Sequence, residues 1–155
     1  MKRNKDVIIK DLSEEHSKEL TKLLQTSDSK HSEYFIPFDF NYETINKILS
    51  NKKDDKYFGI FIEEEIVGFY MLRGFDEGYE IPSYGVWISQ EYSNLGLGKL
   101  TLYHALSFCK VNKIKKIILS VHPDNIAAKG IYETAGFIFT GEVSEIGHLK
   151  YEKTL

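Results

Sequence analysis

A strand that ends in a glycine-rich turn and opens directly into a helix constrains this chain more than any other stretch. Residues 86–88, Val-Trp-Ile, form an apolar run of the kind that favours a strand. A polar segment follows, and residues 96–98, Gly-Leu-Gly, then open a helical pattern. Glycines at such a junction let a ligand approach the backbone and leave the first helix amides directed outward. The stretch predicts either an anion-binding helix start, usually for phosphate, or a tight turn without a ligand.

A dinucleotide-binding fingerprint fits this turn poorly. That fingerprint has a third glycine three residues after the second one, and here Thr101 occupies that position. The turn alone therefore does not decide between a ligand site and a packing turn.

A second motif lies between residues 121 and 137 and separates two strand-like runs. Its spaced positions are Asn125, Ala128, Tyr132, Gly136 and Phe137. Together the two segments resemble the core motifs of the GNAT superfamily of N-acetyltransferases, Arg/Gln-x-x-Gly-x-Gly/Ala and Asn-x-x-Ala-x-x-x-Tyr-x-x-x-Gly-Phe. The second motif is complete. The first departs at its opening position, where Ser93 replaces a long side chain that would reach a pyrophosphate.

The resemblance implies an α/β fold with a mixed, strongly twisted sheet of about six to seven strands and helices on both faces. The residue patterns predict strands over 7–9, 57–62, 66–73, 80–88, 114–121, 137–141 and 148–154. They predict helices from a cap at residue 11 or 13 to about 24, after a cap at 41, over 97–112 and over 126–135. Pro82 implies a bulge or an edge in its strand. We expect residues 1–155 to form a single GNAT acetyltransferase domain.

The helix over 97–112 carries apolar residues most of the way round. Its polar face is narrow, with Lys99, Ser107 and Lys110 along it. This pattern predicts a helix that is mostly buried.

The resemblance also implies acetyl-CoA as the co-substrate. The pantetheine arm would lie in a wedge between the strand that ends at Ile88 and the strand over 114–121. Asn125 and Ala128, on one face of the helix over 126–135, would also line this wedge. It would pair with main-chain groups of Val86, Trp87 and Ile88, and an oxyanion donor is implied on a bulge near Trp87 or Ile88. The pyrophosphate would bind at the glycine turn, whose expected ligating residues are Ser93, Asn94, Leu95, Gly96, Leu97, Gly98 and Lys99.

Tyr132 is the candidate general acid that would protonate the departing thiolate, and its ring would also border the cofactor. Asn125, Ala128 and Tyr132 are spaced i, i+3 and i+7, so they share one helix face. The alternative is that Tyr132 is a core aromatic and Asn125 only caps the helix.

Glu80 is the candidate general base and a candidate acceptor-binding residue. It has the same strand parity as Val86 and Ile88, so its carboxylate could face the acceptor. A surface carboxylate is the alternative. The neighbouring polar side chains that could supply the same negative rim are Asp76, Glu77 and Tyr79.

The aromatic loop between the first two helices is the candidate acceptor wall, with Tyr34 and Phe38 as its predicted substrate-binding rings. Glu33 and Asp39 lie in the same loop. Aromatic faces and carboxylates together suit a cationic amine. The alternative is that these rings only fill the core.

Composition excludes several other classes. The net charge is only −3 with acidic and basic residues interspersed, so we expect no nucleic-acid partner. No apolar run approaches the ~20 residues of a membrane span, which predicts a cytoplasmic protein without a membrane partner. The lone Cys109 sits in an apolar helix pattern and is expected to be a small buried hydrophobe.

The histidines predict no metal site. His16, His31, His104, His122 and His148 are scattered without ligand spacing, although His122, at the motif boundary, could lie near the active site.

We therefore expect an N-acetyltransferase that transfers an acetyl group from acetyl-CoA to a primary amine of a small molecule by direct attack in a ternary complex, as a monomer or a homodimer. Three alternatives stay open: a non-catalytic acyl-CoA-binding or sensing module of the same fold, a protein N-acetyltransferase, and a globular domain whose glycine turn serves only packing.

Overall fold

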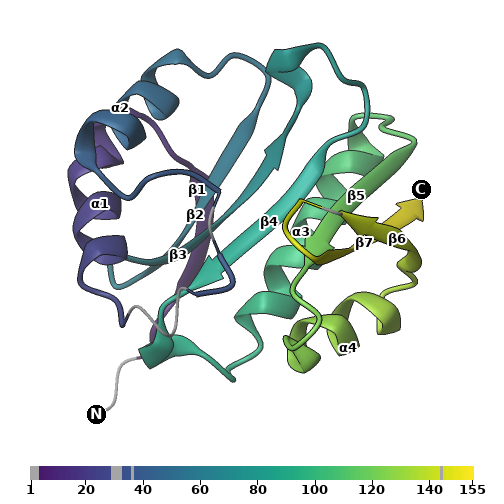
Figure 1. The fold of residues 1–155 in the computed structure, drawn as a ribbon. Coiled ribbons are helices and arrows are strands. Elements are labelled where there is room, and N and C mark those ends of the chain that lie inside the picture. The colour runs from purple at the N-terminus through teal and green to yellow at the C-terminus, as the bar shows by residue number, and fades with distance from the viewer. Residues whose placement is uncertain (1–3, 29–32, 36, 144) are drawn as a thin grey trace.

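The computed structural model describes residues 4–28, 33–35, 37–143 and 145–155, and His31 of the sequence analysis lies outside them. Its strands form one mixed sheet in the order β1-β2-β3-β4-β5-β7-β6 (Figure 1). The strands are β1 (Val7–Asp11), β2 (Lys56–Ile62), β3 (Glu65–Arg73), β4 (Ser83–Ile88), β5 (Lys116–Val121), β6 (Ile138–Val143) and β7 (His148–Thr154). The helices are α1 (Ser17–Gln25), α2 (Tyr42–Asn51), α3 (Leu97–Val111) and α4 (Ile126–Thr134). The predicted fold class is confirmed.

The one parallel pairing in this sheet, between β4 and β5, lies at its centre. The other neighbouring strands run antiparallel. The β4–β5 connection contains α3, as a parallel crossover requires. Parallel strands carry their carboxyl ends at one edge of the sheet, so the segments that follow β4 and β5 come together there.

The helices cover opposite faces of the sheet. α1 and α2 lie together beside β1, β2 and β3, where Leu20, Leu24, Ile45 and Leu49 pack against Phe69 and Trp87 (Figure 1). α3 and α4 share the other face, where their buried residues include Leu102, Leu106 and Tyr132, packed on Leu119 and Tyr151. From Phe69 to Leu72 of β3, alternate side chains thus enter two different cores, Phe69 and Met71 on one face and Tyr70 and Leu72 on the other.

The predicted helix caps are partly confirmed. Asn41 caps α2, because its Oδ1 accepts a hydrogen bond of 2.8 Å from the Thr44 amide. Ser13 caps a short 3-10 turn, Glu14–His16, and α1 begins only after that turn.

Helix α3 is less buried than predicted. Leu97, Leu102, Leu106 and other apolar residues face the core, but Leu100, Tyr103 and Val111 are exposed. The reason is that a helix lying on one face of a sheet can bury only one side of its circumference.

The expectation that Pro82 marks a bulge or an edge of its strand is also wrong, because β4 pairs with both β3 and β5. β4 begins at Ser83, and its pairing with β3 runs without a shift from Arg73↔Ser83 to Gly68↔Ile88. Pro82 stands just before the ladder, where its missing N–H removes no bond to β3, and its carbonyl accepts from the Ile118 amide of β5.

Candidate active site

The central strands separate soon after they meet. β4 and β5 pair only at Ser83↔Ile118 and Tyr84↔Leu119. Beyond this point a cavity of about 520 Å³ opens, lined by the ends of both strands, the start of α3 and one face of α4. We call this cavity the cleft.

Most of the residues predicted to bind the cofactor line this cleft. They are Val86, Trp87, Ile88, Ser93, Asn94, Gly96, Leu97, Gly98, Lys99, Asn125, Ala128 and Tyr132. Leu95 does not line it, and its side chain is 67% exposed. The lining also includes residues that the motifs do not mark, among them Tyr84, Tyr92 and Ile131.

Strand parity decides which backbone groups face the cleft. The Ser89 amide donates to the Val67 carbonyl of β3 at 2.8 Å, whereas the Pro82 carbonyl accepts from β5 at 3.0 Å. Backbone groups alternate in direction along a strand. The Val86 and Ile88 amides therefore point toward the β5 side, and the Trp87 amide points toward β3. Of the two expected oxyanion donors, Trp87 has its amide on the wrong side.

The start of α3 presents main-chain donors to the cleft. Gly96 caps the helix with φ of +85°, a conformation that favours glycine, and Asn94 before it has φ of +61°. The Leu100 amide is the first to bond within the helix, to the Gly96 carbonyl at 2.9 Å. The amides of Leu97, Gly98 and Lys99 have no acceptor within the helix, which makes this end suited to an anion.

Ser93 contributes little through its side chain. Its hydroxyl donates to the Gln90 carbonyl at 2.7 Å and so closes the turn before α3. The charged side chain at this end of the cleft is instead Lys99, which is exposed in the first turn of the helix.

The face of α4 that was expected to line the wedge does so. Asn125 caps the helix, with its Oδ1 accepting from the Ala128 amide at 3.3 Å, and the same residue lines the cleft. Tyr132 also borders the cleft although it is only 8% exposed. Its ring packs edge-on against Tyr84, with ring centroids 6.3 Å apart. Burial raises the pKa of Tyr132 well above its usual range, so the phenol keeps its proton at neutral pH.

The structure does not bring Glu80 to the cleft. Glu80 precedes the first residue of β4 and lines a separate cavity of about 870 Å³ with Lys113 and Lys115. That cavity is at the opposite end of β4. Parity was the wrong guide here, because Glu80 is not part of the strand and Pro82 lies between them.

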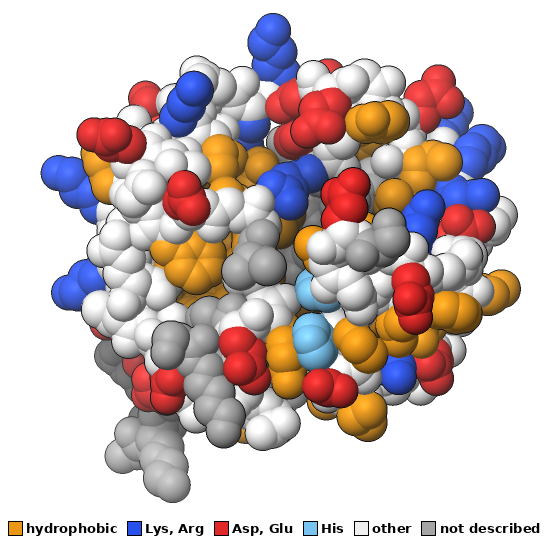
Figure 2. All heavy atoms as spheres, viewed as in Figure 1, with side chains coloured by type: hydrophobic (Ala, Val, Ile, Leu, Met, Phe, Trp, Pro, Cys, Tyr) orange, Lys and Arg blue, Asp and Glu red, His pale blue; other side chains and the backbone are white. Residues whose placement is uncertain are grey.

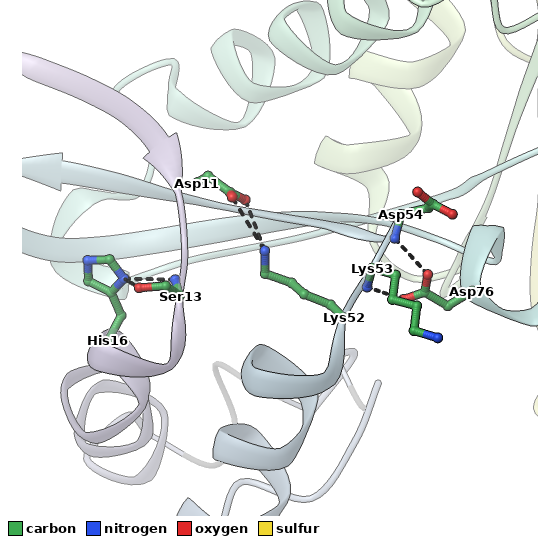
Figure 3. A network of polar contacts seen from close by, with 7 residues as sticks. All are labelled: Asp11, Ser13, His16, Lys52, Lys53, Asp54 and Asp76. Carbon is green, nitrogen blue, oxygen red and sulfur yellow. Dashed lines mark hydrogen bonds and ion pairs between the residues drawn. The ribbon is translucent and has the colours of Figure 1, made fainter.

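The Asp76 carboxylate binds a neighbouring loop and does not form the negative rim that was considered for the acceptor. Its carboxylate accepts from the Lys53 amide at 3.0 Å and from the Asp54 amide at 2.7 Å (Figure 3). These bonds lower the pKa of the Asp76 carboxyl. Tyr79 lines the same separate cavity as Glu80.

The aromatic loop divides between the cleft and the core. Tyr34 lines the cleft and stacks on His122, with ring centroids 4.2 Å apart and 20° between the planes. Phe38 does not line the cleft. It packs on Phe69 and Phe40, which agrees with the alternative that the loop rings fill the core. Phe35, which was not among the predicted substrate-binding rings, touches both the cleft and Phe69.

His122 joins the cleft, as its position at the motif boundary suggested. Its Nδ1 accepts from the Asp124 amide at 3.1 Å, and its ring packs edge-on against His148 at 5.6 Å. Burial, together with the nearby His122, lowers the pKa of His148. In the part of the chain that the structure describes, no three His, Cys, Asp or Glu side chains come together to hold a metal ion.

Two further expectations can be compared with the structure. Cys109 is fully buried, and burial raises the pKa of its thiol to about 11, which confirms a packing role.

Within the described ranges, no helix is long and apolar enough to span a membrane. Figure 2 shows acidic and basic side chains interspersed over the face seen in Figure 1.

A mixed sheet whose central strands part over a glycine-capped helix is the architecture of the GNAT acetyltransferases. The chain belongs to this family: the model of the acetyltransferase (GNAT) family matches residues 10–137. The protein is therefore an N-acetyltransferase.

Named relatives agree with this assignment, and a solved structure shares the fold. The chain is 32% identical over 123 residues to a spermine/spermidine N(1)-acetyltransferase of Bacillus subtilis, which covers 73% of this chain and 81% of that relative. It is 32% identical over 80 residues to a 5-NmdU N-acetyltransferase of Pseudomonas phage PaMx11, covering 52% and 55%. The PaiA N-acetyltransferase of Thermoplasma acidophilum, solved in complex with coenzyme A, shares the fold with a TM-score of 0.77 and 21% identity, over 97% of this chain and 99% of that one.

Proposed function

We propose that this N-acetyltransferase transfers the acetyl group of acetyl-CoA to a primary amine of a small molecule, by direct attack in a ternary complex. One observation carries the proposal: the amide-presenting start of α3 and the protonated phenol of Tyr132 line the same cleft. The first suits a pyrophosphate and the second a departing thiolate.

The cleft residues fit the parts of acetyl-CoA. The amides of Gly98 and Lys99 and the Lys99 ammonium would hold the pyrophosphate. The Val86 backbone, past the last β4–β5 pair, would receive the pantetheine arm as a neighbouring strand would. The solved neighbour with bound coenzyme A supports this co-substrate.

The reaction needs few side chains. The ammonium first loses a proton to solvent water, and the neutral amine nitrogen then forms a bond to the thioester carbonyl carbon. As the C–S bond breaks, the sulfur takes a proton from Tyr132. The second amine proton leaves to water as the amide forms, and Tyr132 regains a proton from water. The Val86 amide, which points toward the β5 side, would donate to the carbonyl oxygen as it gains negative charge. We assign no carboxylate base, because Glu80 lines a different cavity.

A cationic acceptor suits the other side of the cleft. The Tyr34 ring stacks on His122 there, and the pKa of Tyr34 is raised by desolvation and then by the carboxylates of Glu33 and Asp124. Aromatic faces and carboxylates together favour an ammonium group. The Bacillus subtilis relative, named for spermine and spermidine, and the phage relative, named for 5-NmdU, support a small-molecule amine.

Thermal unfolding with acetyl-CoA, with free CoA and with a dinucleotide tests the cofactor half of the proposal. A ligand at ~100 times its Kd adds about 2.7 kcal/mol of apparent stability, which raises the midpoint by several degrees. We expect a rise with acetyl-CoA and CoA and none with the dinucleotide. No rise with acetyl-CoA at any concentration would contradict the proposal.

Release of free thiol from acetyl-CoA tests the acceptor half. Spermidine, a monoamine of similar length and a peptide with a free N-terminus would be compared at equal concentration. We expect turnover with a small amine. Binding of acetyl-CoA without thiol release would favour the non-catalytic binding module, and turnover of the peptide alone would favour a protein acetyltransferase.

A further inference from the structure

A buried tyrosine stands where β4 and β5 part. Tyr84 makes the last β4–β5 pair, with Leu119, and its side chain is only 3% exposed. Its hydroxyl lies 3.2 Å from the Thr101 hydroxyl, and Thr101 is itself fully buried in α3. A residue of the sheet thus reaches the first turns of the helix that lines the cleft.

The direction of this hydrogen bond follows from the partners of Thr101. The Thr101 hydroxyl shares its one proton between the carbonyls of Leu97 and Gly98, which lie 2.9 Å from its oxygen. A carbonyl oxygen only accepts, so the single hydroxyl proton of Thr101 is directed to the helix. Tyr84 must therefore donate to Thr101. Burial raises the pKa of Tyr84 well above its usual range, so this proton is retained.

The two carbonyls that accept from Thr101 belong to the same peptide units as two of the amides at the start of α3. The Leu97 carbonyl shares a planar peptide unit with the Gly98 amide, and the Gly98 carbonyl shares one with the Lys99 amide. Fixing a carbonyl therefore fixes the N–H on the opposite edge of the same plane. A chain of hydrogen bonds also polarises its members, which makes these amides stronger donors.

We propose that Tyr84 is a positioning residue, which acts through Thr101 to fix the Gly98 and Lys99 amides toward the pyrophosphate of the acyl donor. This inference rests on the proposed function, since it assumes that the start of α3 binds that group. Tyr84 takes no part in the acetyl transfer itself.

The substitution Tyr84→Phe tests the inference, with CoA and pantetheine as the two probes. Pantetheine lacks the pyrophosphate, so it cannot sense the two amides. We expect the Kd for CoA to rise roughly five-fold, the size of one neutral buried hydrogen bond, while the Kd for pantetheine stays unchanged. Calorimetry for CoA and ligand-observed NMR for pantetheine supply the two values.

Tyr70→Phe is the matched control. Tyr70 is a fully buried tyrosine of the neighbouring strand β3, and its hydroxyl bonds His104, one turn further along α3. Both variants lose one buried hydroxyl that bonds the same helix. We expect similar losses in melting temperature and a change in CoA affinity for Tyr84→Phe alone.

Two substitutions at Thr101 keep the inference falsifiable if Tyr84→Phe folds poorly. Thr101→Val removes the hydroxyl and should weaken CoA binding at least as much, whereas Thr101→Ser keeps it and should bind CoA as the wild type does. An equal loss of CoA and pantetheine affinity, or an equal effect of Tyr70→Phe, would overturn the inference. If the wild-type protein binds no CoA, the proposed function fails first; unchanged CoA affinity in Tyr84→Phe defeats the positioning role alone.

Discussion

The two sides of the cleft offer different kinds of chemical group to a ligand. On the α3 and α4 side, the groups suited to a ligand are mostly backbone amides, such as those of Gly98 and Lys99. On the side that we propose for the acceptor they are side chains, the stacked rings of Tyr34 and His122, which come from loops far apart in the sequence. A backbone-built surface tolerates changes such as Ser93, whereas a surface built from side chains changes with each substitution.

The largest expected effect is on the backbone-built side. A Cβ at Gly98 would lie at ordinary contact distance, 3.9 Å, from the Ile131 side chain, and Gly98 lines the cleft, so we expect the Gly98→Leu side chain to occupy cleft space without a clash at its Cβ. We expect the variant to melt at or above the wild-type temperature, because leucine is the better helix former, and to show no shift with CoA.

Gly130→Leu is the control for that substitution. Gly130 lies on α4 with open space around it and does not line the cleft. It should keep the CoA-induced shift. A Gly98→Leu variant that binds CoA normally would show that the start of α3 is not the cofactor side.

Tyr132→Phe should have the next largest effect. Removing the phenol proton should lower kcat tenfold or more with little change in the Kd for acetyl-CoA, the usual range for loss of general acid catalysis. Steady-state kinetics and calorimetry measure the two quantities. Equal turnover would assign Tyr132 to the core, as its contacts with Tyr84 and Phe137 also allow.

Single substitutions of Tyr34 and Phe38 test the proposed acceptor side of the cleft. Tyr34→Ala should raise the acceptor KM several-fold without changing the KM for acetyl-CoA, because it removes one face of the cleft. Phe38→Ala should leave both KM values unchanged and cost about 1–3 kcal/mol of unfolding free energy, since its ring is half-buried on Phe69. The reverse outcome would make Phe38 the acceptor residue.

The smallest effect concerns the loop away from the cleft. The folded pKa of Asp76 is lowered by the Lys53 and Asp54 amides, so its carboxylate stabilises the protein above the ordinary Asp pKa of about 3.9. This contribution is lost as pH falls from that value through the lower folded pKa. Asp76→Asn should therefore be less stable than the wild type at neutral pH, with the difference shrinking in acid. Activity per folded molecule should be unchanged at neutral pH, and a loss of turnover would mean that Asp76 reaches the acceptor.

The sequence by itself determined the family, the order of the elements and most of the residues that line the proposed cofactor side of the cleft. These features depend on local periodicity, on glycine conformations such as that of Gly96, and on the helix spacing of Asn125, Ala128 and Tyr132. Each operates within a few residues of the chain, so a linear pattern records it. Ser93 departs from the motif in the sequence, but only its bond to the Gln90 carbonyl shows what its hydroxyl does.

The tertiary structure alone decided which distant side chains meet. Strand parity predicted that the Glu80 carboxylate faces the acceptor. However, β4 begins after Pro82, and Glu80 lies at the end of the strand opposite the cleft. The loop rings of Tyr34 and Phe38 look alike in the sequence, and packing sends one to His122 and the other to Phe69. The physical reason is that such contacts depend on where two separate elements cross in space. No local pattern of residues specifies that crossing.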